Sequence, residues 1–99
     1  MASFLRTPEF DNWLKALRDQ RAKARIIARI RSAEAGNFGD CASVGGGISE
    51  MRIHIGPGYR LYFCRKEEIA YLLLCGGDKS SQQRDIRTAK ALLKSLENP

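Results

Sequence analysis

The sequence predicts an α+β protein: a small antiparallel-cored sheet with an N-terminal helical hairpin and a C-terminal helix, in the order β-α-α-β-β-β-α. Two observations support this. Apolar residues recur at helical spacing before residue 36 and again after residue 80, whereas residues 48–75 contain three short strand-like runs. With 99 residues and 43% hydrophobic content, the chain is expected to form one domain, residues 1–99, around a single core.

The N-terminal part predicts a short strand followed by two helices. Residues 2–6 can form the strand, and Thr7 and Pro8 then read as an N-cap and a proline at the first helical position. The first helix carries an apolar stripe of Phe10, Trp13, Leu14 and Leu17. The second is expected from about Arg21 to Ala35, with Gly36 as its stop. Its buried side is expected to consist of Ile26, Ile27 and Ile30.

The second half predicts three strands and the last helix. Residues 36–47 are glycine-rich and read as a connecting loop. Strands are expected at 48–55, 59–65 and 69–75, and the last, almost wholly apolar, should lie inside the sheet. Ser80 and Gln83 match a capping box at the start of the final helix. Its apolar stripe consists of Ile86, Ala89, Leu93 and Leu96.

Charge and cysteine content point to the partner and the compartment. The net charge is +6 and the pI is about 9.6, which favours an acidic or polyanionic partner. The three cysteines, Cys41, Cys64 and Cys75, form no close pair, which argues against a disulfide framework and a zinc site. No signal-peptide-like or membrane-spanning run is present, so we expect a cytoplasmic protein with no membrane partner.

The stretch "GGGISEMRIHIGPGYRLYF" predicts a hairpin with one polar face. A three-residue loop at 56–58 would pair His54 with Arg60 and Arg52 with Tyr62. Any odd-numbered loop keeps these side chains in phase, so the face is predicted more firmly than the register. One sheet face is therefore expected to gather Arg52, His54, Arg60 and Tyr62.

This cluster suits cleavage of RNA, because RNA supplies its own nucleophile in the 2′-hydroxyl. The two arginines can hold phosphate oxygens, Tyr62 offers a hydroxyl and a stacking surface, and no metal or cofactor is required. A neighbouring arginine disfavours a charged histidine, so His54 is expected to be mostly neutral at pH 7 and able to act as a base. The alternative is that His54 is one polar residue on a solvated face.

Two glycine-rich segments could in principle bind phosphate. Residues 44–49 lack the spacing of a nucleotide-binding loop and lead into a strand, so they are expected to be a flexible entry to the sheet. In "GGDKSS", Lys79 precedes the last helix, where an anion is favoured. The alternative for this segment is a strand-to-helix turn with a capping serine.

Three segments, "RTPEFDNWLKALRD", "GGGISEMRIHIGPGYRLYF" and "GGDKSSQQRDIRTAKAL", together resemble the RelE/ParE toxin superfamily, and within it the HigB-like, phage-derived addiction-module killer proteins. The resemblance extends from about Phe4 to Leu96. It implies a toxin of a type II toxin–antitoxin pair, with a helix-turn-helix antitoxin as partner and a joint complex that binds operator DNA. Similar members cut messenger RNA on the ribosome without a metal.

The resemblance also implies roles for individual residues. Arg52 and Arg60 match the basic strand positions that contact the phosphate in cleaving members, and Lys79 falls where the family often has a lysine pair before its last helix. With His54 these residues form the expected catalytic set. Substrate binding is expected from Tyr62, Arg65 and Arg84. The chain lacks the phenylalanine-containing double-lysine motif and the C-terminal tyrosine of several ribonuclease members. Two alternatives stay open: a non-enzymatic, ParE-like inhibitor of DNA gyrase, and a toxin that now only binds its antitoxin and operator DNA.

Overall fold

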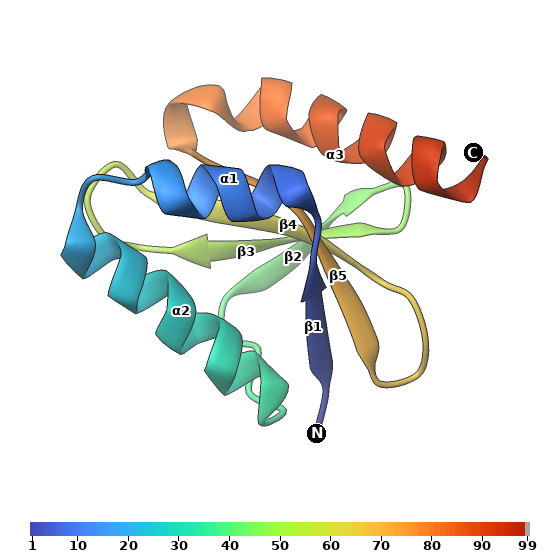
Figure 1. Cartoon of the computed structure of the whole chain (residues 1–99), viewed down its shortest axis with the longest axis horizontal. Helices are drawn as coiled ribbons and strands as arrows, with labels where there is room; N and C mark the ends of the chain where they lie inside the picture. The colour runs from blue at the N-terminus through green and yellow to red at the C-terminus, as the bar shows by residue number, and fades with distance from the viewer. Residues whose placement is uncertain (99) are drawn as a thin grey trace.

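The protein folds as a mixed five-stranded sheet with helices packed on it (Figure 1). The computed structural model describes residues 1–98. The strands are β1 (Ser3–Arg6), β2 (Cys41–Gly45), β3 (Ile48–Ile53), β4 (Tyr59–Arg65) and β5 (Ala70–Asp78). The helices are α1 (Pro8–Ala16), α2 (Gln20–Glu34) and α3 (Gln82–Glu97), with a 3-10 turn, η1 (Lys79–Ser81), before α3.

The strand order is β1-β5-β4-β3-β2, which confirms the α+β class and the inside position of the apolar strand. The pairs β2–β3, β3–β4 and β4–β5 are antiparallel, and the edge strand β1 runs parallel to β5. None of the helices within residues 1–98 is both long enough and apolar enough to span a bilayer.

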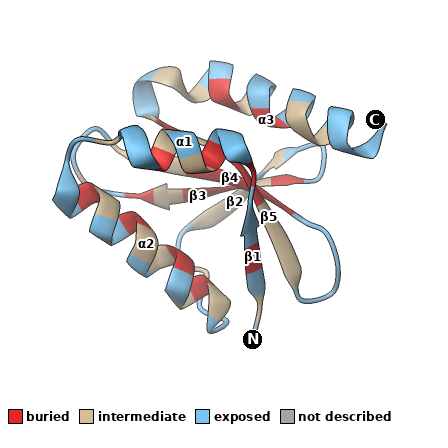
Figure 2. Ribbon diagram, in the orientation of Figure 1, coloured by how far each residue is buried: buried red, intermediate tan, exposed pale blue. Residues whose placement is uncertain are grey.

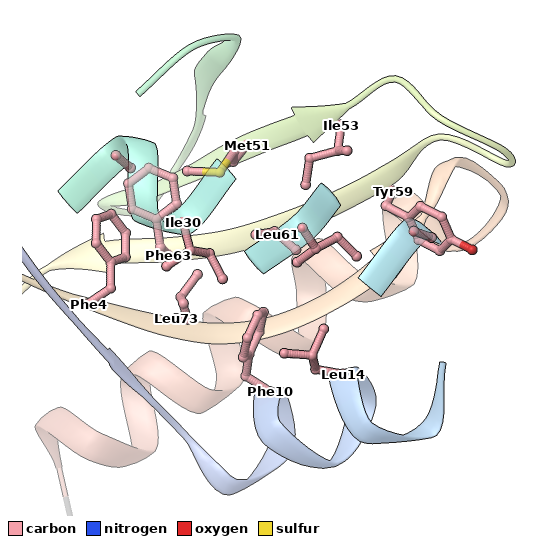
Figure 3. Packing of buried hydrophobic residues seen from close by; sticks show 13 residues of the cluster. Phe4, Phe10, Leu14, Ile30, Met51, Ile53, Tyr59, Leu61, Phe63 and Leu73 are labelled. Atoms are coloured by element: carbon pink, nitrogen blue, oxygen red, sulfur yellow. The ribbon is translucent and has the colours of Figure 1, made fainter. Parts of the chain in front are cut away.

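The sheet buries apolar side chains on both of its faces, as the red central strands of Figure 2 indicate. The larger cluster joins α1 and α2 to the sheet; Figure 3 shows Phe10, Leu14 and Ile30 packed against strand residues. The smaller cluster joins α3 to the other face through Ala89, which lies against Tyr62 and its neighbours. The helical hairpin and the last helix therefore cover opposite faces, and the polar hairpin residues lie on the α3 side.

The predicted helix boundaries at the N-terminal hairpin are confirmed. The backbone N–H of Phe10 donates to Thr7 Oγ1 at 3.0 Å, and the Thr7 hydroxyl donates to the carbonyl of Leu74 at 2.6 Å. Thr7 therefore caps α1 and also fastens it to β5. Asp19 caps α2, and Gly36 follows that helix with a φ of 99°, a conformation that favours glycine.

One strand was missed, because residues 36–47 were expected to form only a loop. The observed order is β-α-α-β-β-β-β-α, with β2 paired to β3. Gly46 and Gly47 form the two-residue turn between them, with φ values of 66° and 80°. Two successive residues with positive φ give the turn that suits the twist of a hairpin, and a Gly-Gly pair is a known signal for it. The expected flexible entry to the sheet is therefore a tight hairpin turn.

The register predicted for the next hairpin is wrong by two residues. Arg52 pairs with Arg60 and Glu50 pairs with Tyr62, so the loop spans five residues, 54–58. His54 therefore does not pair with Arg60 and lies beyond the end of β3. Gly56 and Gly58 both have positive φ, which ends the strands earlier than a three-residue loop would. Because the loop still has an odd number of residues, the strand residues Arg52, Arg60 and Tyr62 lie on one face of the sheet, as predicted.

Strand β5 is longer than predicted, since it continues through Gly76 and Gly77. A Cβ at Gly76 would overlap the indole ring of Trp13, and one at Gly77 would overlap the carboxylate of Asp85. The two glycines thus let α1 and α3 approach the strand from opposite faces. The capping box predicted at Ser80 and Gln83 is wrong, because Asp78 and Ser81 form a capping box around η1 instead.

Candidate functional site

A groove of 350 Å³ opens beside the β3–β4 loop, and three of the predicted site residues, His54, Arg60 and Lys79, line it. The loop supplies His54, β4 supplies Arg60 and η1 supplies Lys79. Gly58 lies between the two cations: a Cβ there would be 3.8 Å from Arg60 Nη1 and 3.6 Å from the Lys79 Cβ. The fold therefore brings a histidine and two cations to one groove.

Arg60 is the most enclosed cation at this groove, since its side chain is 12% exposed. Its Nε atom is buried, has no hydrogen-bond partner among the residues described, and lies 3.5 Å from Oε2 of Glu50. Because Nε is buried against the Glu50 carboxylate, this ion pair holds the guanidinium in place at the edge of the groove. The remaining guanidinium donors suit an anionic oxygen.

The buried carboxylate of Glu50 pairs with both Arg52 and Arg60, a role that was not predicted from the sequence. It accepts hydrogen bonds from Arg52 Nε at 3.0 Å, the Tyr62 hydroxyl at 2.9 Å and Gln82 Nε2 at 2.9 Å. Burial raises the pKa of Glu50, but the bonds from Gln82, Arg52 and Tyr62 and the charge of Arg60 outweigh burial and leave the pKa below its usual value. Glu50 therefore stays ionised and balances the paired arginines.

Arg52 is held beside the groove by two carboxylates. Its Nη1 atom lies 3.3 Å from Asp40 Oδ1, in addition to the bond from Nε to Glu50. Arg52 is absent from the residues that line the groove, although the sequence placed it beside His54. Its charge therefore acts next to the groove, while Arg60 and Lys79 reach into it.

Asp40 comes from the segment before β2, and Arg29 holds that segment in place. The guanidinium of Arg29 donates to the carbonyls of Phe38 at 2.9 Å and Arg52 at 2.6 Å. The backbone N–H of Arg52 in turn donates to the Asp40 carbonyl at 2.9 Å. Arg29, one of several basic residues on α2, therefore has a structural role.

The ring of His54 is oriented by Asp40, because its Nε2 atom lies 2.7 Å from Asp40 Oδ2. An ionised carboxylate can only accept hydrogen bonds, so Nε2 carries a proton in this contact and Nδ1 is the nitrogen left for a substrate. The bond to His54 lowers the pKa of Asp40, and the charge of Arg52 adds to this effect. Because the side chain of His54 is 71% exposed, a substrate can reach the ring.

The expected substrate-binding residues lie apart from one another. Tyr62 is fully buried, so in this structure its ring has no face free to stack on a base; burial and the bond to Glu50 also raise the pKa of its phenol. The Arg65 side chain donates to the carbonyls of Glu67 and Glu68 at the far end of β4. Arg84 lines a second groove, which Lys79 also borders.

The sequence held a signal for Glu50, one of the two carboxylates that were not predicted. Glu50 alternates in phase with Arg52 on β3, which places it on the same face. An acidic side chain on a face with two arginines is typical of a charge-balanced cluster. Asp40 carried no comparable signal, because it lies 14 residues before His54 and meets it only through the β2–β3 pairing.

The chain matches one family model and a bacterial relative. Residues 12–94 match the family described as phage-derived protein Gp49-like (DUF891). An uncharacterized protein of Haemophilus influenzae (strain ATCC 51907 / DSM 11121 / KW20 / Rd) is 51% identical over 90 residues, which cover 91% of each chain. The matched region includes every predicted site residue.

Proposed function

Because the chain belongs to the Gp49-like family of phage-derived proteins, we propose that it is a RelE/ParE-type toxin of a type II toxin–antitoxin pair that cleaves messenger RNA on the ribosome. The proposal includes a helix-turn-helix antitoxin as the neutralising partner, operator DNA as a target of the joint complex, and action in the cytoplasm. A phage origin is typical of addiction modules, and the basic charge suits a ribosomal RNA surface.

The single observation that carries the proposal is the groove shared by His54, Arg60 and Lys79. Cleavage through the 2′-hydroxyl needs a proton acceptor and positive charge at the phosphate, and both are present within one small opening. Glu50 holds the enclosed guanidinium of Arg60 through Nε, which leaves the other guanidinium N–H groups to meet an anionic oxygen. A surface that served only to bind a protein would not need an oriented histidine beside an enclosed arginine.

In the proposed reaction, Nδ1 of His54 removes the proton of the 2′-hydroxyl, and the oxygen attacks the adjacent phosphorus. Arg60 and Lys79 stabilise the additional negative charge of the phosphorane, while Arg52 contributes charge from beside the groove. The bond to the 5′-oxygen then breaks, and Lys79 is the groove residue that can return a proton to it. The products are a 2′,3′-cyclic phosphate and a 5′-hydroxyl.

The ribosome is expected to be required, because an open groove with three functional side chains cannot by itself align the 2′-oxygen with the leaving group. The test is primer extension on a defined messenger RNA in a reconstituted translation reaction, with and without ribosomes. Cuts at fixed positions only when ribosomes are present support the proposal. Growth arrest without cuts, together with inhibition of purified DNA gyrase, would contradict it and support the ParE-like alternative.

A further inference from the structure

A second groove adjoins the first and is lined by η1 and the start of α3. Its volume is 540 Å³, and Lys79 borders both grooves. Three cations line this second groove: Lys79, Arg84 and Arg87. Asp78 also lines it, but its carboxylate oxygen Oδ1 already accepts from the backbone N–H and the hydroxyl of Ser80, at 2.8 and 2.5 Å. These bonds keep Asp78 ionised, and the three cations outnumber this one carboxylate, so the net charge of the groove lining is positive.

The positive charge continues along the solvent face of α3. We call the exposed residues Arg84, Arg87, Lys90 and Lys94 the α3 stripe. Arg84, Arg87 and Lys94 lie on the side of the helix away from the buried Ala89, and Lys90 flanks them near the β2–β3 turn. The stripe covers about 15 Å of the helix at its usual rise. Asp85 is the one acidic residue between 82 and 96, and it is buried against Ser81. Within residues 1–98, Arg84 is the only member of the stripe with an ion pair, a loose contact of 3.6 Å to Asp85.

The composition of this face favours a phosphate backbone over a protein partner. Leu96, which is 47% exposed, and Glu97 lie beyond the stripe at the end of α3. Between Arg84 and Lys94 the other exposed positions are Thr88 and Ala91. Protein interfaces are usually centred on aromatic or large apolar side chains, and none lies among these positions. Repeated cations without apolar anchors are typical of surfaces that follow nucleic-acid phosphates.

We propose that the second groove and the α3 stripe form a binding site for the RNA strand that flanks the cleaved phosphate. The strand passes from His54 and Arg60 over Lys79, which both grooves share, and continues along α3. This inference rests on the proposed function, because it names the site that holds the substrate of that reaction. The site supplies affinity and takes no part in bond breaking.

The test measures binding of a fluorescein-labelled single-stranded RNA whose 2′-hydroxyls are methylated, so that it cannot be cleaved. Fluorescence anisotropy gives the dissociation constant at several salt concentrations for the native chain and for a variant with Arg84→Gln, Arg87→Gln, Lys90→Gln and Lys94→Gln. Each lost phosphate contact reduces the slope of log K against log salt by about 0.7, so we expect the slope to fall by about 2 to 3 in the stripe variant.

The matched control removes four exposed cations from the other helical layer: Lys15→Gln, Arg21→Gln, Arg25→Gln and Arg31→Gln. Circular dichroism checks that both variants are folded. A smaller slope for the stripe variant, with the control close to the native chain, supports the inference. Equal losses in the two variants would overturn it, since net charge alone would then explain binding. Binding of an oligo-glutamate probe to the stripe, with no binding of RNA, would also overturn it.

This readout separates the inference from the proposed function, because it requires no cleavage. If the chain never cuts RNA on ribosomes but the stripe variant still loses RNA affinity selectively, the proposed reaction fails and the site stands. If the native chain cuts and the stripe variant binds and cuts equally well, only the site fails.

Discussion

Nε2 of His54 and Oδ2 of Asp40 lie 2.7 Å apart, so the one histidine of the chain is oriented by a carboxylate from a different hairpin. This contact predicts a functional role for Asp40. In Asp40→Asn the amide can either accept or donate, so the ring is no longer held with its proton on Nε2. Ribosome-dependent cleavage is expected to fall by about tenfold or more, as for the loss of general-base assistance. Single-turnover primer extension measures the rate.

The matched control for Asp40→Asn is Asp11→Asn, which also removes an exposed carboxylate paired with an arginine but lies on α1, outside both grooves. Its cleavage rate should remain close to that of the native chain. Equal rates for Asp40→Asn and the native chain would show that Asp40 does not assist His54.

The buried carboxylate of Glu50 predicts an acid dependence of stability. Its pKa in the folded chain lies below its usual value of 4.5, so its contribution is present above that value and is lost as the pH falls through the folded-state pKa. In Glu50→Gln this loss is absent, and the gap in unfolding free energy between native and variant should narrow as the pH falls below about 4.5. Urea unfolding from pH 7 to pH 3 measures the gap.

Asp40 and Asp78 also have lowered pKa values, but both residues are present in the native chain and in Glu50→Gln. Their contributions to the pH dependence therefore cancel when the two unfolding free energies are subtracted. At pH 7 the variant should be less stable by about 1–3 kcal/mol, because buried donors lose a charged acceptor. A gap that stays constant over the whole pH range would contradict the assignment of Glu50 as an ionised partner.

Loss of the Tyr62 hydroxyl is expected to lower the stability of the fold without lowering the cleavage rate. Tyr62→Phe removes a donor from the buried Glu50 carboxylate and is expected to lower the free energy of unfolding by about 2 kcal/mol. Because the ring does not reach the groove surface, the cleavage rate per folded molecule should stay near the native rate. The control is Tyr71→Phe, whose hydroxyl makes no hydrogen bond within residues 1–98. A large loss of cleavage in folded Tyr62→Phe would contradict this prediction and show that the Tyr62 hydroxyl takes part in the reaction.

Gly76 predicts a steric coupling between β5 and α1. A methyl group at this position meets the ring of Trp13, so Gly76→Ala should destabilise the fold by about 1–3 kcal/mol. In a Trp13→Ala background the same change should cost clearly less, since the overlap is gone. Chemical denaturation of the four proteins gives the coupling, and strict additivity would mean that the glycine is required for another reason.

Periodicity and capping signals predicted the helices and the three central strands, because those signals are local. The Gly46–Gly47 turn was also local but was interpreted as flexibility, so β2 was missed. The sequence could predict that Arg52 and Arg60 share one face of the sheet, but not that they pair directly. The register depends on the length of the loop, which depends on which glycines adopt positive φ. The Asp40–His54 contact depends on the pairing of two hairpins, and no spacing along the chain encodes such a contact.

The most direct test of the account compares Arg60→Ala with Arg65→Ala in ribosome-dependent primer extension. Both changes remove an arginine from β4, but Arg65 lies about 17 Å farther along the strand and outside the groove. Circular dichroism confirms that each variant is folded. We predict that cleavage falls at least about a hundredfold in Arg60→Ala, as for the loss of a charge-stabilising donor, and remains near native in Arg65→Ala. Native cleavage by folded Arg60→Ala would contradict the placement of the reaction in this groove.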